Sequence, residues 1–536
     1  MNAEVIEAPK KKKGIPLLGG LAVFCFLVLL FTGQVATGTR PDFALLVSTF
    51  IIVGAWSIKI LGGPFTLPGA SVSVLMLQHV VISQVAKVFM NQSASDPLLN
   101  PMETMKVYNL AILAICAASY AFRAIRVDKI RPLFGFVTDV STLRIMTAIL
   151  SVFAIFRFVM LQKFGVYEGG GVYVGGFVGP LRQLGFVTLL AIACGTAYMI
   201  LKSDGKRCLG GWNTITIVAT TLFGILGAGR QEAASSVVTF VLTLIAFKFK
   251  FKAQHFGFAI LIALVFLRII FPYSLYARGE GGVREGTLEK RIQKASEILV
   301  DVALDPGKYK KKETTIDPHQ SWYVQRMYYY GRPISTLDRY SVIISTDNIV
   351  HAVLQRGPAG WKNATAGFGM LLPRFLNPEK EALGSSNTLA HYGDGLVGDT
   401  DFMTQITLGM IPEGFYSAAW IGVPIALFVV SFLYFSVYRM LYYKTMFNNV
   451  FVLSQIFTIT WSFSESTLQG QTLNILQTPV YYIAVVYPVM LFAKSMTKKT
   501  REAPFIFASP HDSDENSPGI QTDFANPPQP SASQNA

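Results

Sequence analysis

The sequence predicts an all-α, polytopic integral membrane protein with about twelve transmembrane helices and one large helical extracytoplasmic loop. Hydrophobic residues make up 51% of the 536 residues and charged residues only 15%, whereas soluble domains carry roughly 25% charged residues. The apolar residues fall into runs near twenty residues long, the length that crosses the hydrocarbon core of a bilayer as a helix. A soluble, disulfide-rich or disordered class is therefore excluded for most of the chain.

Twelve apolar runs are candidate spans. The third run is the most polar, because it carries Gln78, His79, Gln84 and Lys87. Omitting it would reverse the charge asymmetry of the loops that follow, so the charge pattern favours keeping it. The candidate spans are 15–33, 42–61, 72–90, 106–122, 141–161, 181–201, 210–227, 233–249, 255–272, 412–437, 447–464 and 476–493.

The net charge of +14 fits loops of a membrane protein better than nucleic-acid binding, because Lys and Arg accumulate on cytoplasmic loops. Lys10 to Lys13 precede the first span, which places the N-terminus in the cytoplasm. From the fourth span onward, the connections after the even-numbered spans are basic, whereas the outside connections 91–105 and 465–475 contain no Lys or Arg. Both termini are therefore predicted to be cytoplasmic, and the long loop after the ninth span extracytoplasmic.

Five regions follow from this topology. They are a basic cytoplasmic N-terminus (1–14), a transmembrane bundle of about nine spans (15–272), an extracytoplasmic loop subdomain (273–411), about three further spans (412–493) and a cytoplasmic tail (494–536). Apolar residues with helical spacing predict amphipathic helices at 288–302 and 339–356. The tail is rich in Pro, Ser, Asn and Asp without an apolar period, which predicts disorder.

The sequence contains no sign of a metal or nucleotide site. Cys25, Cys116, Cys194 and Cys208 lie in or beside apolar runs, without a CxxC or Cys/His cluster. We interpret them as packing residues and expect no disulfide, no metal and no cofactor. The glycine-rich stretch 169–179 lacks the Gly-Lys-Ser/Thr ending of a P-loop.

Several arginines lie near the predicted outer boundary, where the topology rule disfavours them. Singly, each could snorkel or pair with a loop carboxylate. Together they favour a polyanionic headgroup, because guanidinium groups match phosphate oxygens in a bidentate way. Arg230 follows Gly227-Ala228-Gly229, where the backbone can approach a ligand closely, although a cation that only caps a helix end is equally consistent. The set is Arg157, Arg182, Arg230, Arg268, Arg326, Arg332, Arg339, Arg356 and Arg374.

Three motifs resemble a known family. The stretch 373–380 reads Pro-Arg-x-x-x-Pro-x-Lys, His391-Tyr392-Gly393-Asp394-Gly395 follows it, and Pro412-Glu413-Gly414 opens the next span. This order, together with the Gly-x-Gly-Arg-x-Glu stretch that ends at Glu232, resembles the bacterial oligosaccharide repeat-unit polymerases of the O-antigen polymerase-like and O-antigen ligase-like family. Where members often show an Asn-x-Gly after the Gly-Glu pair, this chain has Ala418-Ala419, so a catalytic role for Glu413 stays open.

The resemblance implies a GT-C-like fold in the bacterial inner membrane and an enzyme that polymerises undecaprenyl-pyrophosphate-linked oligosaccharides. The lipid diphosphate would be the leaving group, and partners would include membrane lipids, a chain-length regulator and a flippase, but no nucleic acid. Cations would stabilise the developing charge on the diphosphate, and a base would accept the proton of the attacking hydroxyl. The candidates for the first role are Arg230, Arg374 and Lys380, with Arg268 and Arg339 as auxiliaries. The candidates for the second are His391, Asp394 and Glu232.

Aromatic residues between 321 and 330 could stack on sugar rings, or form an interfacial belt. Three other functions remain as alternatives. A ligase of the same family would transfer the finished glycan to another acceptor. A transporter or flippase of lipid-linked oligosaccharide should contain repeated spans and mid-membrane charges, and a scaffold component would leave the arginines without a role.

Overall fold

The computed structural model describes most of the chain between residues 16 and 497. The described residues are 16–125, 132–135, 137, 139–163, 181, 183–226, 230–279, 288–305, 328–331, 337–371, 385–393, 396, 406, 408–442 and 449–497. Within these ranges the structure is helical, and the only extended pairing is an isolated bridge between Phe134 and Tyr442. The predicted all-α class is confirmed for this part of the chain.

A helix occupies each of the twelve predicted runs. The first four are α1 (Pro16–Ala36), α2 (Pro41–Ile60), the continuous α3 (Leu67–Met76), η1 (Leu77–Val81) and α4 (Ile82–Phe89), and α5 (Pro101–Ala124). The next four are α6 (Val140–Lys163), α8 (Phe186–Lys202), α9 (Gly211–Leu226) and α10 (Arg230–Ala246). The last four are the continuous α11 (Ala253–Val265), η3 (Phe266–Ile270) and α12 (Phe271–Gly279), then α19 (Met410–Leu441), α20 (Val450–Glu465) and α21 (Leu468–Thr497).

Helices also form in the predicted loop subdomain. They are α13 (Leu288–Leu304), the 3₁₀ turn η5 (Asp338–Tyr340), α16 (Val342–Arg356), α17 (Lys362–Leu371) and α18 (Ser385–Tyr392). The amphipathic helices predicted at 288–302 and 339–356 are thus present, the second beginning three residues later than expected. Helices α17 and α18 were not predicted, because both are short and have no sustained apolar period.

Seven helices or continuous runs among the described residues are long and apolar enough to cross a membrane. They are α2, the run from α3 to α4, α5, α6, the run 253–274, α19 and α21. Their outward surfaces carry large apolar side chains such as Leu45, Ile52 and Val480, which are more than half exposed. Such a surface is typical of a protein that faces lipid. The count of twelve spans stays a prediction, because α1, α8, α9 and α10 have apolar segments shorter than 18 residues and α20 has only 16 residues.

The connections between helices gather at two ends of the bundle. At one end, the Thr142 hydroxyl at the start of α6 lies 3.1 Å from that of Thr497 at the end of α21. The ion pair Lys250–Asp204, at 2.9 Å, joins two further connections. At the other end, the Ala94 amide donates to Thr39 at 2.8 Å, so the connections after α1 and α4 meet there.

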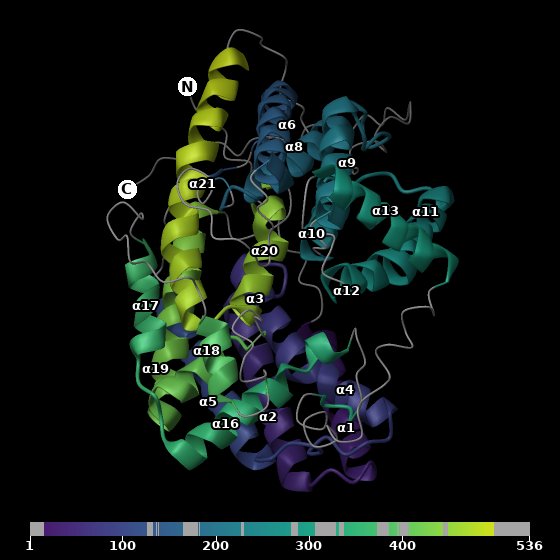
Figure 1. The fold of residues 1–536 in the computed structure, drawn as a ribbon. Helices are drawn as coiled ribbons and strands as arrows, with labels where there is room; N and C mark the ends of the chain where they lie inside the picture. Colours follow the sequence, from purple (N-terminus) through teal and green to yellow (C-terminus); the bar gives the residue numbers. More distant parts are fainter. Residues whose placement is uncertain are drawn as a thin grey trace, which may run out of the picture.

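Helices α16, α17 and α18 of the predicted loop subdomain lie at this second end, which we call the loop-side end (Figure 1). Asp347 of α16 accepts hydrogen bonds from residues at the start of α5, and Asn363 of α17 donates to Glu413 at the start of α19. In Figure 1, α17 and α18 lie near the lower end of the long yellow helix α21, whose first residue is Leu468. These three helices therefore cover the end of the bundle that the charge pattern predicts to be extracytoplasmic.

Helix α19 is interrupted close to the loop-side end. The backbone leaves helical geometry at Ala418 and Ala419, and Ala419 adopts a φ of 48°. The carbonyl groups of Tyr416 and Ser417 instead accept hydrogen bonds from the amides of Ala359 and Gly360, at 2.9 and 3.1 Å. The segment between α16 and α17 thus satisfies backbone groups that the break in α19 would otherwise leave unpaired.

Candidate functional site

The residues predicted to act on the diphosphate and the acceptor lie in several segments. Arg230 and Glu232 lie in the first turn of α10, and Arg339 lies in η5, but their side chains are outside the described residues. Arg268 lies in the π-helical turn η3 with an exposed side chain. Arg374, Lys380 and Asp394 lie outside the described residues altogether. No pair of the predicted residues is seen in contact among the side chains that are described.

The end of α9, four positions before Arg230, is bound by Arg291 of the loop subdomain, a residue that was not among the predicted site residues. Arg291 of α13 is 1% exposed. Its guanidinium donates to Gln162 Oε1 of α6 at 2.8 Å and to the carbonyl oxygen of Leu226, the last residue of α9, at 3.3 Å. A cation at the carbonyl end of a helix is favourable both as a hydrogen-bond donor and against the helix dipole.

A second contact reinforces this attachment. The Tyr273 hydroxyl of α12 donates to the carbonyl oxygen of Ile225 at 2.8 Å. Tyr273, Ala277, Ala295, Ile298 and Val302 form a small apolar cluster against the end of α9. Helices α12 and α13 together therefore hold the end of α9, four positions before Arg230.

His391 is held at the loop-side end by the residue that follows it. It occupies the last turn of α18 and is partly buried. The carbonyl oxygen of Tyr392 accepts a hydrogen bond from the Arg356 guanidinium at 3.1 Å, and the Tyr392 ring packs edge-on against Tyr416, with centroids 4.8 Å apart. Because Arg356 ends α16 and Tyr416 lies near the start of α19, His391 belongs to the same end of the molecule as the break in α19.

A polar cluster forms where the third span meets α20. The π-helical turn η1 brings two consecutive side chains to one partner segment: Gln78 donates to Glu465 Oε1 at 2.6 Å, and His79 donates through Nε2 to the carbonyl oxygen of Ser464 at 3.0 Å. Nδ1 of His79 then accepts from the Tyr108 hydroxyl at 3.2 Å. Single π turns inside α-helices frequently occur at functional sites, so this cluster is a candidate site that the sequence analysis did not identify.

Glu413 caps a helix. It is fully buried, and it accepts hydrogen bonds from Asn363 Nδ2 at 2.8 Å and from the backbone amide of Leu468, the first residue of α21. A carboxylate at a helix start satisfies free amides and complements the helix dipole. The resemblance left open whether Glu413 has a catalytic role. Its hydrogen bonds suit a structural role.

Asp347 anchors α16 in a similar way. It is fully buried and accepts from the backbone amides of Leu99 and Asn100 at 2.6 and 3.0 Å, and from the Thr104 hydroxyl at 2.7 Å. Burial raises the pKa of the Asp347 carboxyl above its usual range, and the three hydrogen bonds oppose that rise. Asp347 thus joins the loop subdomain to the start of α5.

The tyrosines at 329 and 330 neither stack on a sugar nor form an interfacial belt, because both are buried. The Tyr329 hydroxyl donates to the carbonyl oxygen of Ala94 and accepts from Gln84 Nε2 at 2.9 Å, and the Lys87 ammonium lies 4.6 Å from the ring centroid. Tyr329 therefore packs a loop segment against the polar third span. The aromatic residues at 321–327 lie outside the described residues.

Like Arg356, which donates to the carbonyl oxygen of Tyr392, Arg157 of the outer set has a structural partner in the backbone. Arg157 is 5% exposed and donates through Nε to the carbonyl oxygen of Leu181 at 2.9 Å. With Ala154, Thr188 and Phe223 it lines a pocket of about 20 Å³, which is room for about one water molecule. This contact accounts for Arg157 without a ligand.

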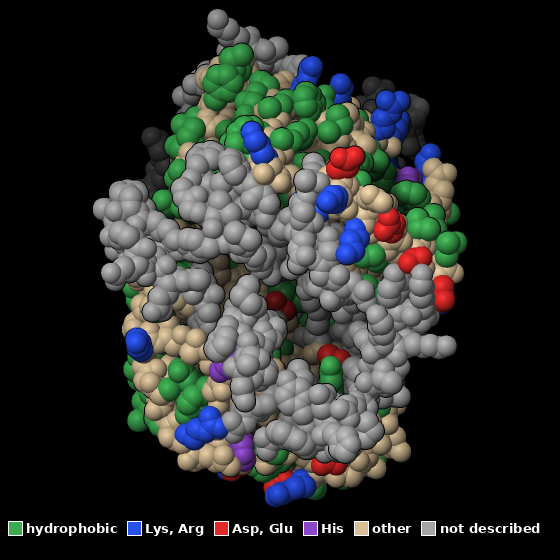
Figure 2. Space-filling view, in the orientation of Figure 1, with side chains coloured by type: hydrophobic (Ala, Val, Ile, Leu, Met, Phe, Trp, Pro, Cys, Tyr) green, Lys and Arg blue, Asp and Glu red, His purple; other side chains and the backbone are tan. Residues whose placement is uncertain are grey.

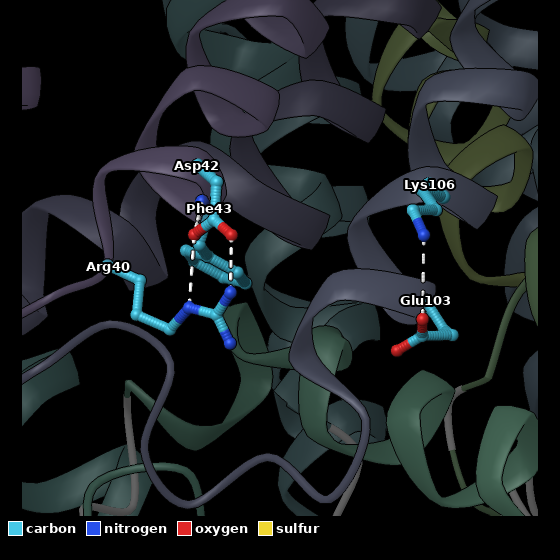
Figure 3. A network of polar contacts seen from close by, with 5 residues as sticks. All are labelled: Arg40, Asp42, Phe43, Glu103 and Lys106. Carbon is cyan, nitrogen blue, oxygen red and sulfur yellow. Dashed lines mark hydrogen bonds and ion pairs between the residues drawn. The ribbon is translucent and has the colours of Figure 1, made fainter.

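On the loop-side surface, charged side chains pair with oppositely charged residues that are near them in the sequence. Figure 3 shows that Arg40 contacts Asp42 at the start of α2 and that Lys106 contacts Glu103 at the start of α5. Such exposed pairs contribute little to stability. Figure 2 shows a hollow on one face of the molecule, with acidic side chains visible inside it.

The described residues contain no group of three or more His, Cys, Asp or Glu side chains that could hold a metal ion. The four cysteines are free: Cys116 and Cys194 are buried, Cys208 is partly buried, and Cys25 is exposed on α1. The packing interpretation is therefore wrong for Cys25, because α1 turns this apolar face outward. No protein-family model, curated protein or solved structure matches the chain.

Proposed function

We propose that this protein is a glycosyltransferase-type polymerase of the bacterial inner membrane. It joins undecaprenyl-pyrophosphate-linked oligosaccharide repeat units into an exopolysaccharide or O-antigen, and it has a GT-C-like bundle of twelve spans with both termini in the cytoplasm. The observation that carries the proposal is the contact of Arg291 with the carbonyl group of Leu226. This contact supports a loop subdomain that rests on the membrane end next to Arg230, as interfacial chemistry on a lipid diphosphate requires.

In the proposed reaction, each predicted residue acts on either the leaving group or the attacking hydroxyl. A hydroxyl oxygen of the incoming repeat unit attacks the anomeric carbon of the growing glycan, the bond from that carbon to the diphosphate oxygen breaks, and the electron pair leaves with the diphosphate. Arg230, Arg374 and Lys380 stabilise the charge that develops on the leaving group, with Arg268 and Arg339 as auxiliaries. The hydroxyl proton passes to a base, for which His391, Asp394 and Glu232 are the candidates.

The test compares glycans from a deletion strain complemented with wild-type protein, Arg230→Ala or Arg230→Lys. We expect both variants to lose long-chain product, since lysine keeps the charge but lacks the planar fork. The loss of such a contact lowers the rate roughly 10²–10³-fold. Arg40→Ala is the matched control, because Arg40 lies at the same end but pairs with Asp42.

The readout is glycan chain length at equal protein level in the membrane. Long chains at normal yield from Arg230→Ala would reject the diphosphate assignment. The glycans that accumulate in the deletion strain distinguish the polymerase from the ligase and the flippase. Long glycan that stays on the lipid carrier would indicate a ligase. Single repeat units trapped on the cytoplasmic face would indicate a flippase.

A further inference from the structure

The last two turns of α20 present a face that the proposed function does not yet use. Phe457, Trp461 and Glu465 are spaced four residues apart and so lie along one side of the helix. The Trp461 ring stacks on Phe457 with centroids 5.6 Å apart, and Tyr340 of the loop subdomain meets it edge-on at 6.2 Å. Trp461 and Glu465 are both partly exposed. An aromatic ring and a carboxylate are thus accessible one turn apart at the loop-side end.

A buried amide group lies directly behind this face. Gln78 is 1% exposed, and its Nε2 donates to Glu465 Oε1 at 2.6 Å. Its Oε1 has no hydrogen-bond partner among the described residues. Because Oε1 and Nε2 belong to one amide group, this oxygen lies beside the carboxylate. A buried acceptor without a donor costs free energy, and in native proteins it usually has a water or ligand partner.

The chemistry of these groups selects one class of ligand. A carboxylate and an amide oxygen accept hydrogen bonds, so a ligand that binds beside both of them is rich in donors. The negative charge of Glu465 disfavours a phosphate or a carboxylate at the same place. The ring of Trp461 offers a flat apolar surface. A pyranose ring meets all three conditions, because it has an apolar C–H face and hydroxyl groups around its edge.

We propose that Trp461, Glu465 and Gln78 form a sugar-binding subsite, which holds a pyranose ring of the lipid-linked glycan. This inference rests on the proposed function and names the part of the substrate that the subsite recognises. The position fits that role. Helix α10 packs against α20, and the predicted topology puts both the start of α10, with Arg230, and the end of α20, with Glu465, on the extracytoplasmic side. The diphosphate and the glycan would then bind at the ends of two neighbouring helices.

The test measures binding of a soluble probe to the purified full-length protein. The probe is the oligosaccharide released by mild acid from the lipid-linked repeat units of the host cell, and saturation-transfer NMR reports its Kd. We expect Glu465→Gln to weaken binding on the order of tenfold, because hydrogen bonds to a charged acceptor are the stronger ones. Trp461→Leu should weaken it by a similar factor, and Trp461→Phe by only about threefold, since phenylalanine keeps an aromatic surface.

Glu103→Gln is the matched control, because Glu103 is an exposed carboxylate at the same end that pairs with Lys106. Its Kd should equal that of the wild type. Glu465→Gln keeps an oxygen that can accept from Gln78, so this variant should fold even if Trp461→Leu does not. Wild-type affinity in both Glu465→Gln and Trp461→Phe would overturn the subsite, as would equal weakening in Glu103→Gln.

Glycan profiles of the same strains separate this inference from the proposed function. If deletion abolishes polymer but Glu465→Gln and Trp461→Phe both bind the probe with wild-type affinity, the subsite is wrong and the polymerase stands. If deletion leaves polymer unchanged while Glu465→Gln loses probe binding, the subsite stands and the polymerase is wrong.

Discussion

Asp347 offers the most direct test of how the loop subdomain is attached. Replacing Asp347 by alanine removes the acceptor for three donors: the amides of Leu99 and Asn100 and the hydroxyl of Thr104. A buried donor without a partner costs roughly 1–3 kcal/mol. Leu99 and Asn100 are partly exposed, so water can replace part of the loss and the lower limit applies to their two amides. The buried Thr104 hydroxyl contributes at least the same amount. The total is about 3 kcal/mol, which corresponds to about a 100-fold change in an equilibrium constant.

The assay is hydrogen exchange, read by mass spectrometry, on the protein in lipid nanodiscs. We expect the amides of α16 (Val342–Arg356) to exchange up to about 100-fold faster in Asp347→Ala, because local opening becomes more frequent by that factor. The control is Glu103→Ala, which removes an exposed pair on α5 worth less than about 1 kcal/mol. Equal exchange of α16 in Asp347→Ala and in the wild type would refute the anchoring role.

Three further predictions concern the attachment of α13, the cofactor and the topology. Arg291→Met should release α13 from α9, because Gln162 and Leu226 lose their donor. Protease cleavage within 288–304 should then become faster, by the factor that corresponds to a loss of roughly 2–3 kcal/mol in the free energy that holds α13 in place. An unchanged cleavage rate would contradict this role. Polymer formation should continue in EDTA, since cationic side chains can neutralise the diphosphate, whereas a loss restored by Mg²⁺ would point to a metal site around Asp394 and Asp399. Reporter fusions at about residues 135, 310 and 510 should signal inside, outside and inside; a cytoplasmic signal at 310 would reject both the topology and the proposed chemistry.

The helices were predictable because an apolar run is a local property of the chain. The predicted span 412–437 corresponds to α19 (Met410–Leu441), and the amphipathic stretch 288–302 to α13. The break in α19 was not predictable, because Ala418 and Ala419 are ordinary helix-forming residues. Their conformation depends on hydrogen bonds from Ala359 and Gly360, which the sequence does not place nearby.

The candidate site was harder to predict because it depends on contacts between distant segments. Gln78 and Glu465 are 387 positions apart, and only packing of the third span on α20 brings them together. The role of Arg291 could have been predicted from the sequence. It lies three residues after Leu288 and four before Ala295, so it places a charge on the apolar face of the helix. A charged residue in such a position requires a buried partner, which here is the end of α9. The roles of Arg230, Arg374 and Asp394 stay predictions.

The polar third span has a consequence for how the protein is made. Gln78, His79, Gln84 and Lys87 enter the membrane early in synthesis, and a polar side chain in an inserting helix costs free energy until it has a hydrogen-bond partner. The residues that bind these side chains are synthesised much later: Tyr329 contacts Gln84 and Lys87, and Ser464 and Glu465 contact His79 and Gln78. Until α20 emerges from the ribosome, this span has no complete set of partners. We therefore expect it to enter the bilayer fully only when the last spans arrive, so that a chain truncated before α20 is recognised and degraded as incompletely assembled.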